Sequence, residues 1–339
     1  MNVFWAPSGE LPKEASSPEE IARFVVEAAV HAPSVHNTQP WWFSHSGSEI
    51  SVHADVERRL AVADPNGREM MISCGAALFT ARVALRYLGL VPAVRLLPDP
   101  DLPNLVARIG WRDHTPPVDY ERQLFTEIPR RRTHRGGFED EPLPASLLSA
   151  LREEAAREHA TLRILGDDGQ RATLAALVEA ADHALRLDSA RVKEESRWTP
   201  PPGSQRRDGV PATAYPARPE RTEPSFPSRD FAHGHGWGLP PSGESAMPRS
   251  AGLVTVLSTA ADRPEDWVNA GQALQRVLLL ASASGVSAAL HSQPLELVQL
   301  RDFIAEHLCG GAQPQMIMRF GATGQSSVSV RRRVDEVLL

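Results

Sequence analysis

The loop formed by residues 32–41 has the highest density of hydrogen-bonding groups in a short, rigid stretch of this sequence. Pro33 and Pro40 bracket it, and because proline fixes φ and disfavours helical backbone before it, the loop is predicted to be a stiff turn. The side chains between the prolines that donate or accept hydrogen bonds include Ser34, His36, Asn37 and Gln39. Such a loop could hold a flat ligand with polar edges. Because Asn, Ser and Pro are common turn residues, an ordinary turn leading into a core strand at Trp41 is the alternative.

A second stretch with chemical potential is the arginine-rich segment, residues 130–138, which reads Arg-Arg-Arg-Thr-His-Arg-Gly-Gly-Phe. Guanidinium groups match phosphate oxygens in a bidentate manner, so this segment could bind a phosphate group. A run of solvated surface charge is the alternative interpretation. A further basic run, Arg331–Arg333, lies close to the end of the sequence.

These motifs resemble those of the FMN-dependent nitroreductase family. The 32–41 loop, Ala-Pro-Ser-x-x-Asn-x-Gln-Pro-Trp, is similar to the loop that lies against the flavin in that family. Residues 131–135 are similar to its Arg-Arg-Ser-x-Arg run, which holds the FMN phosphate, with Thr133 in place of serine. The stretch 331–336 resembles a terminal basic stretch that reaches the same phosphate. The resemblance covers most of the chain and is best to the Acg-type, dormancy-associated nitroreductase-like proteins of actinobacteria.

The resemblance implies one FMN per chain and a set of FMN-binding residues. These are Pro33, Ser34, Val35, Asn37, Gln39, Arg131, Arg132, Thr133, Arg135, His291, Ser292, Gln293, Arg331 and Arg333. By position in the family, Ser292 and Gln293 would face N5 of the flavin, where reduction raises electron density. His291 is either a proton donor or a structural histidine. The acidic residue that the family often has near this point is missing here, and no catalytic residue is assigned.

An internal repeat predicts two related halves. Helical runs that begin at Gly75 and Gly271 each reach a glycine 14 residues later, at Gly89 and Gly285. Glycine is a common helix terminator, and similar apolar segments follow both glycines. Chance similarity of two apolar helices is the alternative. The second run is apolar on more of its sides, which predicts that it is the more deeply buried helix.

Periodicity and capping signals predict the remaining elements. Ser17-Pro18-Glu19-Glu20 is a capping box that begins a helix with an apolar face. The other predicted elements are strands at 42–43, 50–52, 106–110, 162–165, 253–257 and 316–321 and helices at 144–159 and 171–187. Together with the resemblance they predict an α+β, nitroreductase-like fold in which two fused halves, residues 1–120 and 121–339, form an intramolecular pseudo-dimer.

The two halves carry complementary parts of one site. In the family, two identical subunits share each FMN, one giving the phosphate-binding arginines and the other the flavin-face loop. Here the 32–41 loop lies in the first half and the arginine-rich segment in the second. The sequence therefore predicts one complete site and a monomer.

The Pro-rich segment, residues 199–249, is the largest departure from the family pattern. It contains 11 of the 29 prolines of the chain, which disfavours helices and sheets. Long loops in compact domains are commonly lids or binding loops, and its aromatic residues favour packing over disorder, so we expect a lid. The pair His233 and His235 lacks nearby cysteine or carboxylate companions, so no metal site is predicted.

Bulk properties exclude several classes of function. The chain has 339 residues, 42% hydrophobic and 23% charged, with a formal charge of −6, as expected for a globular protein without a nucleic-acid partner. No apolar run is long enough to cross a bilayer, and residues 1–7 lack the features of a signal peptide. Two cysteines in a chain of this length suggest reduced thiols and a cytoplasmic protein.

Three functions follow from the resemblance. The first is an NAD(P)H-dependent oxidoreductase in which FMN passes electrons from NADPH or NADH to a nitro compound, quinone or similar acceptor. The absence of a Gly-x-Gly-x-x-Gly fingerprint agrees with a nicotinamide that docks only transiently on the flavin. The second is an FMN-sequestering protein that the lid closes off. The third, a dehalogenating or lyase-like enzyme on the same fold, is more remote.

Overall fold

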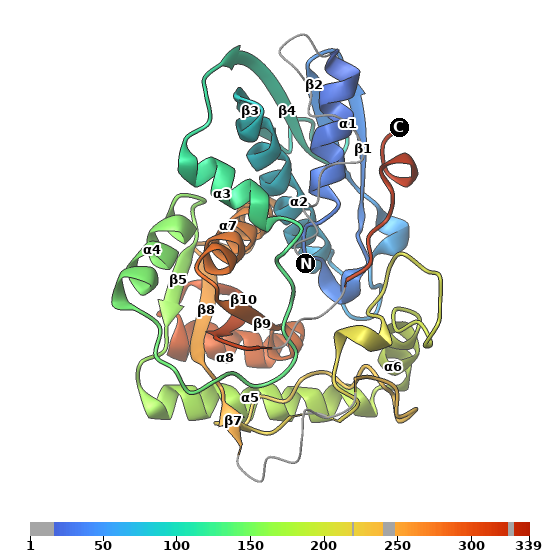
Figure 1. Ribbon diagram of the computed structural model, residues 1–339. Helices are drawn as coiled ribbons and strands as arrows, with labels where there is room; N and C mark the ends of the chain where they lie inside the picture. Colours follow the sequence, from blue (N-terminus) through green and yellow to red (C-terminus); the bar gives the residue numbers. More distant parts are fainter. Residues whose placement is uncertain (1–16, 219, 240–247, 325–328) are drawn as a thin grey trace.

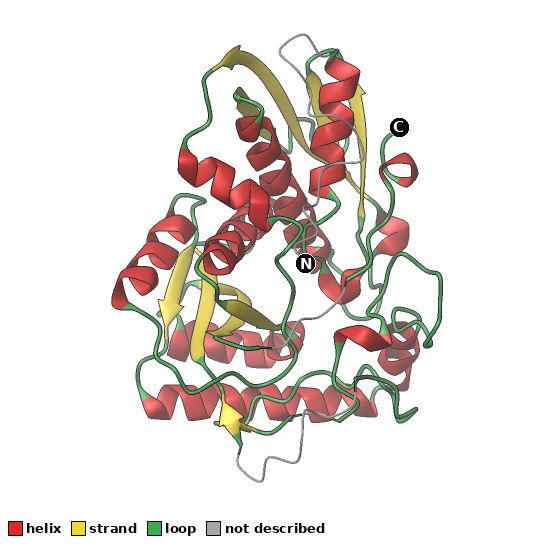
Figure 2. Cartoon of the chain, in the orientation of Figure 1, coloured by secondary structure: helices red, strands yellow, loops and turns green. Residues whose placement is uncertain are grey.

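The computed structural model describes residues 17–218, 220–239, 248–324 and 329–339 and has a mixed α/β architecture (Figure 1). Residues 1–7, for which we expected no signal peptide, lie outside the described residues. So do residues 219 and 240–247 of the predicted lid. Figure 2 shows helices packed around antiparallel strands, which agrees with the predicted α+β class.

The first sheet has the strand order β1-β2-β4-β3, and every neighbouring pair is antiparallel. Its strands are β1 (Trp41–Ser46), β2 (Glu49–Ala54), β3 (Leu90–Leu96) and β4 (Leu105–His114). Trp41 and Phe43 are fully buried, whereas Trp42 between them is partly exposed. This alternation is typical of a strand with one face on the core.

The second sheet has the order β5-β8-β10-β9 and is also antiparallel throughout. Its strands are β5 (Thr161–Ile164), β8 (Leu253–Thr259), β9 (Ser287–His291) and β10 (Gln313–Gly321). When the strands of each sheet are numbered by their order along the chain, both sheets follow the sequence first, second, fourth, third.

Eight α-helices pack on these sheets within the described residues. They are α1 (Pro18–Ala29), α2 (Arg68–Tyr87), α3 (Asp119–Glu127), α4 (Ala145–Ala156), α5 (Asp168–Leu187), α6 (Ser189–Ser196), α7 (Pro264–Ala283) and α8 (Val298–Leu308). The predicted capping box begins α1, where the Ser17 hydroxyl accepts from the Glu20 backbone N–H and the Glu20 carboxylate accepts from the Ser17 N–H. The proposed boundary between the halves, residues 120 and 121, falls inside α3.

Helices α2 and α7 cross at the centre of the molecule at very short distance (Figure 1). A Cβ atom added to Gly75 would lie 2.2 Å from the Val268 carbonyl oxygen, and one added to Gly271 would lie 2.0 Å from that of Ile72. The two glycines on which the prediction of a repeat was based are therefore the contact points of the crossing. Both helices begin seven residues earlier than the repeat predicted, and both are followed by the expected glycines, Gly89 and Gly285, at positive φ.

The expectation that the second helix would be the more deeply buried is wrong. Helix α2 is buried along most of its length, including its polar first turn, whereas α7 has fewer buried residues. Helix α2 contacts α1, the first sheet and α7, so neighbours cover even its polar side. Apolar character on several faces does not by itself determine how many elements pack against a helix.

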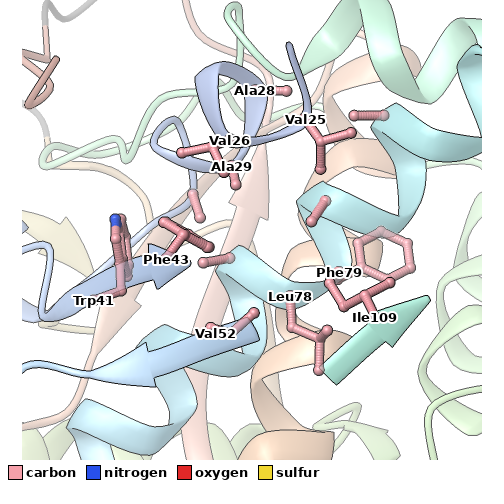
Figure 3. Packing of buried hydrophobic residues seen from close by; sticks show 14 of the residues in the cluster. Val25, Val26, Ala28, Ala29, Trp41, Phe43, Val52, Leu78, Phe79 and Ile109 are labelled. Atoms are coloured by element: carbon pink, nitrogen blue, oxygen red, sulfur yellow. The ribbon is translucent and has the colours of Figure 1, made fainter. Parts of the chain in front are cut away.

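A large apolar core fills the first half, between helices α1 and α2 and the first sheet. Figure 3 shows Val25 and Ala29 of α1, Phe43 of β1 and Leu78 of α2 meeting in this layer. The C-terminal end of the chain joins it, because Val337 is fully buried there. The Phe43 backbone N–H donates to the Val337 carbonyl at 2.6 Å, so the C-terminal segment runs along the edge of β1.

The Pro-rich segment packs against the rest of the protein over its described residues. It contains a short strand, β6 (Thr222–Glu223), which pairs in parallel with β7 (Arg249–Ser250). Tyr215 and Phe226 are 3% and 2% exposed, as expected from their aromatic character in this segment. Among the described helices none is long and apolar enough to cross a membrane, and the described His, Cys, Asp and Glu residues form no group of three that could hold a metal ion.

The helix crossing gives a direct test of the fold. Gly75→Ala and Gly271→Ala each place a methyl group against a backbone carbonyl that cannot rotate away. Overpacking of this kind costs about 1–3 kcal/mol or more, so each variant should lower the free energy of unfolding by at least that amount in urea titrations. Gly166→Ala is the matched control, since a Cβ there meets nothing within 4 Å. Equal stability of all three variants would contradict the tight crossing.

Candidate functional site

The 32–41 loop is the most strained part of the described backbone. It contains a short 3₁₀ helix, η1 (Val35–Asn37), and three non-glycine residues with left-handed φ: His36 at 46°, Asn37 at 53° and Gln39 at 50°. Side chains rarely adopt this region, and such strain persists only where many contacts fix it. One of these contacts is local, because the Ser34 hydroxyl oxygen accepts a hydrogen bond from the Gln39 backbone N–H at 2.9 Å.

The amides of Asn37 and Gln39 fasten two distant segments to the loop. Gln39 is fully buried, its Nε2 donates to the Arg207 carbonyl at 2.8 Å, and its Oε1 accepts from the Arg332 backbone N–H at 2.8 Å. Asn37 Nδ2 donates to the Gly209 carbonyl at 2.8 Å, and its Oδ1 accepts from Arg331 Nη1 at 3.0 Å. The loop therefore joins the Pro-rich segment and the C-terminal basic run.

The loop forms one wall of a cavity, here called the main cavity, with about 890 Å³ of space between atoms, including open solvent. Its walls come from elements that are far apart in the sequence: the loop, the arginine-rich segment, α2, α7, the end of β9, β10 and the Pro-rich segment. The predicted site residues that line it are Pro33, Ser34, Val35, Thr133, Arg135, His291, Ser292 and Gln293. Tertiary folding thus brings together residues from both sequence halves.

A smaller adjoining space, here called the guanidinium pocket, is lined by Asn37, Arg131, Thr133, Arg135 and Arg331. Burial, together with the neighbouring arginines, lowers the pKa of Arg131 to about 9, and burial lowers that of Arg135 to about 10. Burial and the other arginines also lower the pKa of Arg331. Their hydrogen-bond partners are neutral oxygens, of His31, Ala214 and Asn37 for example, and no ion pair joins these three groups to a carboxylate of the described residues, so their positive charges repel one another without compensation.

Several donors of this pocket have no partner among the described residues. Nε and Nη1 of Arg131 and Nε of Arg331 are shielded from solvent and make no hydrogen bond there. A buried donor without an acceptor costs about 1–3 kcal/mol. A phosphate dianion would supply both the missing acceptor oxygens and the missing negative charge, and so its chemistry fits the pocket.

Three predicted site residues lie away from both cavities. The Gln39 side chain donates to the Arg207 carbonyl, Arg132 donates through Nη1 to the Arg131 carbonyl at 2.8 Å, and Arg333 has a side chain that is 63% exposed, close to Asp335. Their assignment to the cofactor stays a prediction that this geometry does not support directly. Gln39 instead organises the loop that lines the main cavity.

Arg319 and His291 form a buried pair that sequence reasoning treated only in part. Arg319 is 1% exposed, and its Nε donates to His291 Nε2 at 2.9 Å. Because Nε2 accepts, a neutral His291 carries its proton on Nδ1, which has no partner among the described residues. The signal for Arg319 was present in the sequence, as a charge in the middle of the apolar strand β10.

The Pro-rich segment contributes Ser228, Arg229 and Phe231 to the wall of the main cavity. Arg229 pairs with Glu195 at 2.6 Å and with Glu296. Phe231 lies beneath the Arg135 guanidinium, 5.2 Å from ring centroid to Cζ. A second anchor joins Arg58 to Asp208, with Nη2 2.6 Å from Oδ2.

His36 also lines the main cavity and is almost completely buried. Neither ring nitrogen has a hydrogen-bond partner among the described residues, although Nε2 lies 4.0 Å from a Glu195 oxygen. Burial, followed by Arg229, Arg191 and Arg135, lowers the pKa of His36 well below its ordinary value. His36 is therefore neutral in the folded protein at pH 7.

Comparison with known proteins gives relatives over most of the chain. It is 33% identical over 304 residues to "Putative NAD(P)H nitroreductase Rv3131" of Mycobacterium tuberculosis, covering 89% of this chain and 85% of that protein. It is 28% identical over 322 residues to "Putative NAD(P)H nitroreductase acg" of the same organism, covering 94% and 95%. No model of a protein family matches the chain.

Among solved structures, a nitroreductase with bound FMN from Desulfitobacterium hafniense matches 63% of this chain and 96% of its own, with 12% identity and a TM-score of 0.41. The FMN-dependent nitroreductase NfnB from Mycobacterium smegmatis in complex with NADPH matches 65% and 93%, with 13% identity and a TM-score of 0.35.

The buried histidines predict a loss of stability in acid. Burial lowers the pKa of His36 and His291 well below the ordinary value in the folded state, whereas both titrate near 6.5 when unfolded. Below that pH the unfolded chain binds more protons, so the free energy of unfolding should fall by up to about 1.4 kcal/mol per pH unit for each histidine. Urea unfolding at several pH values between about 5 and 8 measures this slope.

The variant His36→Gln isolates the contribution of His36 to the pH dependence of the free energy of unfolding. Buried carboxyl groups with raised pKa, such as that of Asp64, act in the opposite direction, but they are present in both the variant and the wild type. Its slope should be smaller than that of the wild type. His307→Gln, on the exposed side of α8, should leave the slope unchanged. An identical slope for His36→Gln and the wild type would contradict the neutral, buried state of His36.

Proposed function

We propose, from the premise that this chain belongs to the same family as the M. tuberculosis NAD(P)H nitroreductase-like protein Rv3131, that it is an FMN-binding oxidoreductase. Electrons from NADPH or NADH would pass through the flavin to a nitro compound, quinone or similar acceptor. The observation that carries the proposal is the guanidinium pocket, in which Arg131, Arg135 and Arg331 carry uncompensated charge beside the main cavity.

The residues present fit FMN, with separate groups for its phosphate and for its ring system. Arg131, Arg135 and Arg331 would bind the phosphate, while Pro33, Ser34 and Val35 would form the wall beside the ring system. When bound, FMN supplies hydride acceptance and onward electron transfer. His291 holds a proton on Nδ1 in the wall of the same cavity, and the Arg319 guanidinium fixes this tautomer.

The arrangement of the two halves is part of the proposal. Three observations support descent from a duplicated subunit and an internal pseudo-dimer: the identical strand order of the two sheets, the paired glycines at the α2–α7 crossing, and the crossing of the C-terminal segment to β1. One site would then be complete, with its ring-face loop from the first half and its phosphate-binding arginines largely from the second. The protein would be a monomer with one FMN.

A second function, sequestration of FMN, is favoured by the contacts of the Pro-rich segment. The segment is anchored at Asn37, Gln39 and Arg58, and Ser228, Arg229 and Phe231 form part of the cavity wall. If the segment acts as a lid that stays closed, a bound flavin would be shielded from nicotinamide and acceptor. Binding of FMN is common to both functions, and access distinguishes them.

Replacement of one uncompensated guanidinium should lower the affinity for FMN and raise the stability of the flavin-free protein. Arg131→Met removes charge-assisted hydrogen bonds to phosphate worth about 1.5–3 kcal/mol, so affinity for FMN should fall about 10- to 100-fold. The same change removes like-charge repulsion, so flavin-free protein should melt at a higher temperature than the wild type. Quenching of flavin fluorescence measures affinity, and the wild type should saturate at one FMN per chain with the mass of a monomer in light scattering.

Riboflavin and Arg333→Met serve as controls for this experiment. Riboflavin lacks the phosphate, so Arg131→Met should bind it as the wild type does. Arg333→Met should reduce FMN affinity less than Arg131→Met does, because that side chain is exposed and does not line the guanidinium pocket. Unchanged FMN affinity in Arg131→Met would contradict the proposal that the guanidinium pocket binds the phosphate of FMN.

Anaerobic mixing with NADPH or NADH distinguishes the two functions. In a reductase, the blue absorption band of the bound flavin should bleach within seconds. In a sequestering protein it should persist, and Arg58→Gln, which breaks the pair with Asp208, should make it bleach faster. Arg95→Gln, which breaks an exposed pair with Glu49, is the matched control. Persistence of the blue absorption band in the flavin-loaded wild type would refute the proposal that the protein is a reductase.

A further inference from the structure

Glu69 is a buried carboxylate in the wall of the main cavity for which the family resemblance gives no role. It lies in the first turn of α2 and is 4% exposed. Its Oε1 accepts from Arg68 Nη2 at 3.2 Å, whereas Oε2 is shielded from solvent and has no hydrogen-bond partner in the described part of the chain. One half of this carboxylate is therefore unsatisfied.

The ion pair with Arg68 supports the ionised form of Glu69. Arg68 is 5% exposed, and its other hydrogen bonds go to the neutral oxygens of Gln315, at 3.1 Å each. Glu69 is the carboxylate that balances the Arg68 charge within the described residues. Burial, together with the nearby Asp64 carboxyl, raises the pKa of Glu69 above its usual range, while the charges of Arg68, Arg229 and Arg191 limit this rise. Because an ionised carboxylate oxygen only accepts hydrogen bonds, Oε2 requires an N–H or O–H donor.

Glu69 and the guanidinium pocket belong to different parts of the site. The guanidinium pocket shares Pro33, Ser34, Thr133 and Arg135 with the main cavity but does not include Glu69. Beyond that shared wall, the lining of the main cavity includes a buried acceptor without a partner, Glu69 Oε2, and a buried donor without one, His291 Nδ1–H, beside the unpaired ring nitrogens of His36. A ring N–H next to a carbonyl, as in an imide, offers the donor that Glu69 Oε2 lacks and the acceptor that His291 Nδ1–H lacks.

We infer that Glu69 is a specificity-determining residue that accepts a hydrogen bond from the imide N–H of a flavin ring, and that it makes the site reject flavins alkylated at this nitrogen. The inference rests on the proposed function, because it needs the ring system to occupy the main cavity. A ligand that carries only acceptors at this edge would face the carboxylate charge without a hydrogen bond and bind poorly.

The test compares FMN with N3-methyl-FMN, which lacks the imide proton, by fluorescence titration of the flavin-free full chain. The wild type should bind N3-methyl-FMN about 10- to 100-fold more weakly, because the analogue leaves a buried carboxylate oxygen unpaired. In Glu69→Gln, Arg68 retains the side-chain oxygen, so an NH₂ group replaces the acceptor. The discrimination should then shrink to about threefold or less.

Asp182→Asn is the matched control, since Asp182 is a buried carboxylate on α5 that pairs with Arg186 and does not line either cavity. It should discriminate as the wild type does. Because the comparison is a ratio of two affinities within one variant, a general loss of folded protein cancels, and thermal melting confirms the folded state.

The outcomes separate this inference from the proposed function. Wild type that binds neither flavin would refute FMN binding itself. Wild type that binds FMN and N3-methyl-FMN within about threefold of each other would overturn only the role of Glu69. Persistence of full discrimination in Glu69→Gln would overturn it as well, because another group would then read the imide.

Discussion

The close crossing of α2 and α7 is the constraint on which the rest of this structure depends. Backbone meets backbone at Gly75 and Gly271, and this contact fixes the distance between the two sheet-bearing halves. The same helices supply Glu69, Ile72 and Leu274 to the main cavity, so the crossing also determines the width of the site. A side chain at either glycine would push apart the walls that must meet around a ligand.

Charge is distributed unevenly around the cavity: some of its arginines pair with carboxylates and others do not. Arg229 has carboxylate partners and joins the Pro-rich segment to α6 and to the turn after β9. Arg131, Arg135 and Arg331 have none among the described residues, which makes their end of the cavity costly until an anion fills it. Paired charges stabilise the contacts between segments, whereas the unpaired arginines are the groups that we propose bind the phosphate.

Much of the fold was accessible from local patterns. The capping box at Ser17, the apolar stripe of α1 and the glycines after both central helices act over a few residues, so the sequence displays them directly. The relative burial of α2 and α7 was not accessible, because it depends on how many elements pack around each helix. The same limit applies to Asn37 and Gln39, whose amides point to partners about 170 and 290 residues away, as their hydrogen bonds to Arg207, Gly209, Arg331 and Arg332 show.

By itself, the sequence determined where the candidate functional groups are concentrated: a polar loop between two prolines and an arginine-rich segment, both visible as residue types at fixed spacing. Only the tertiary structure decided which of them meet. It brought Ser34, Arg135 and His291 to one cavity, left Arg333 exposed, and added Glu69 and Arg319. The physical reason is that hydrogen bonds and desolvation act through space, and the meaning of a buried charge depends on neighbours that chain order does not reveal.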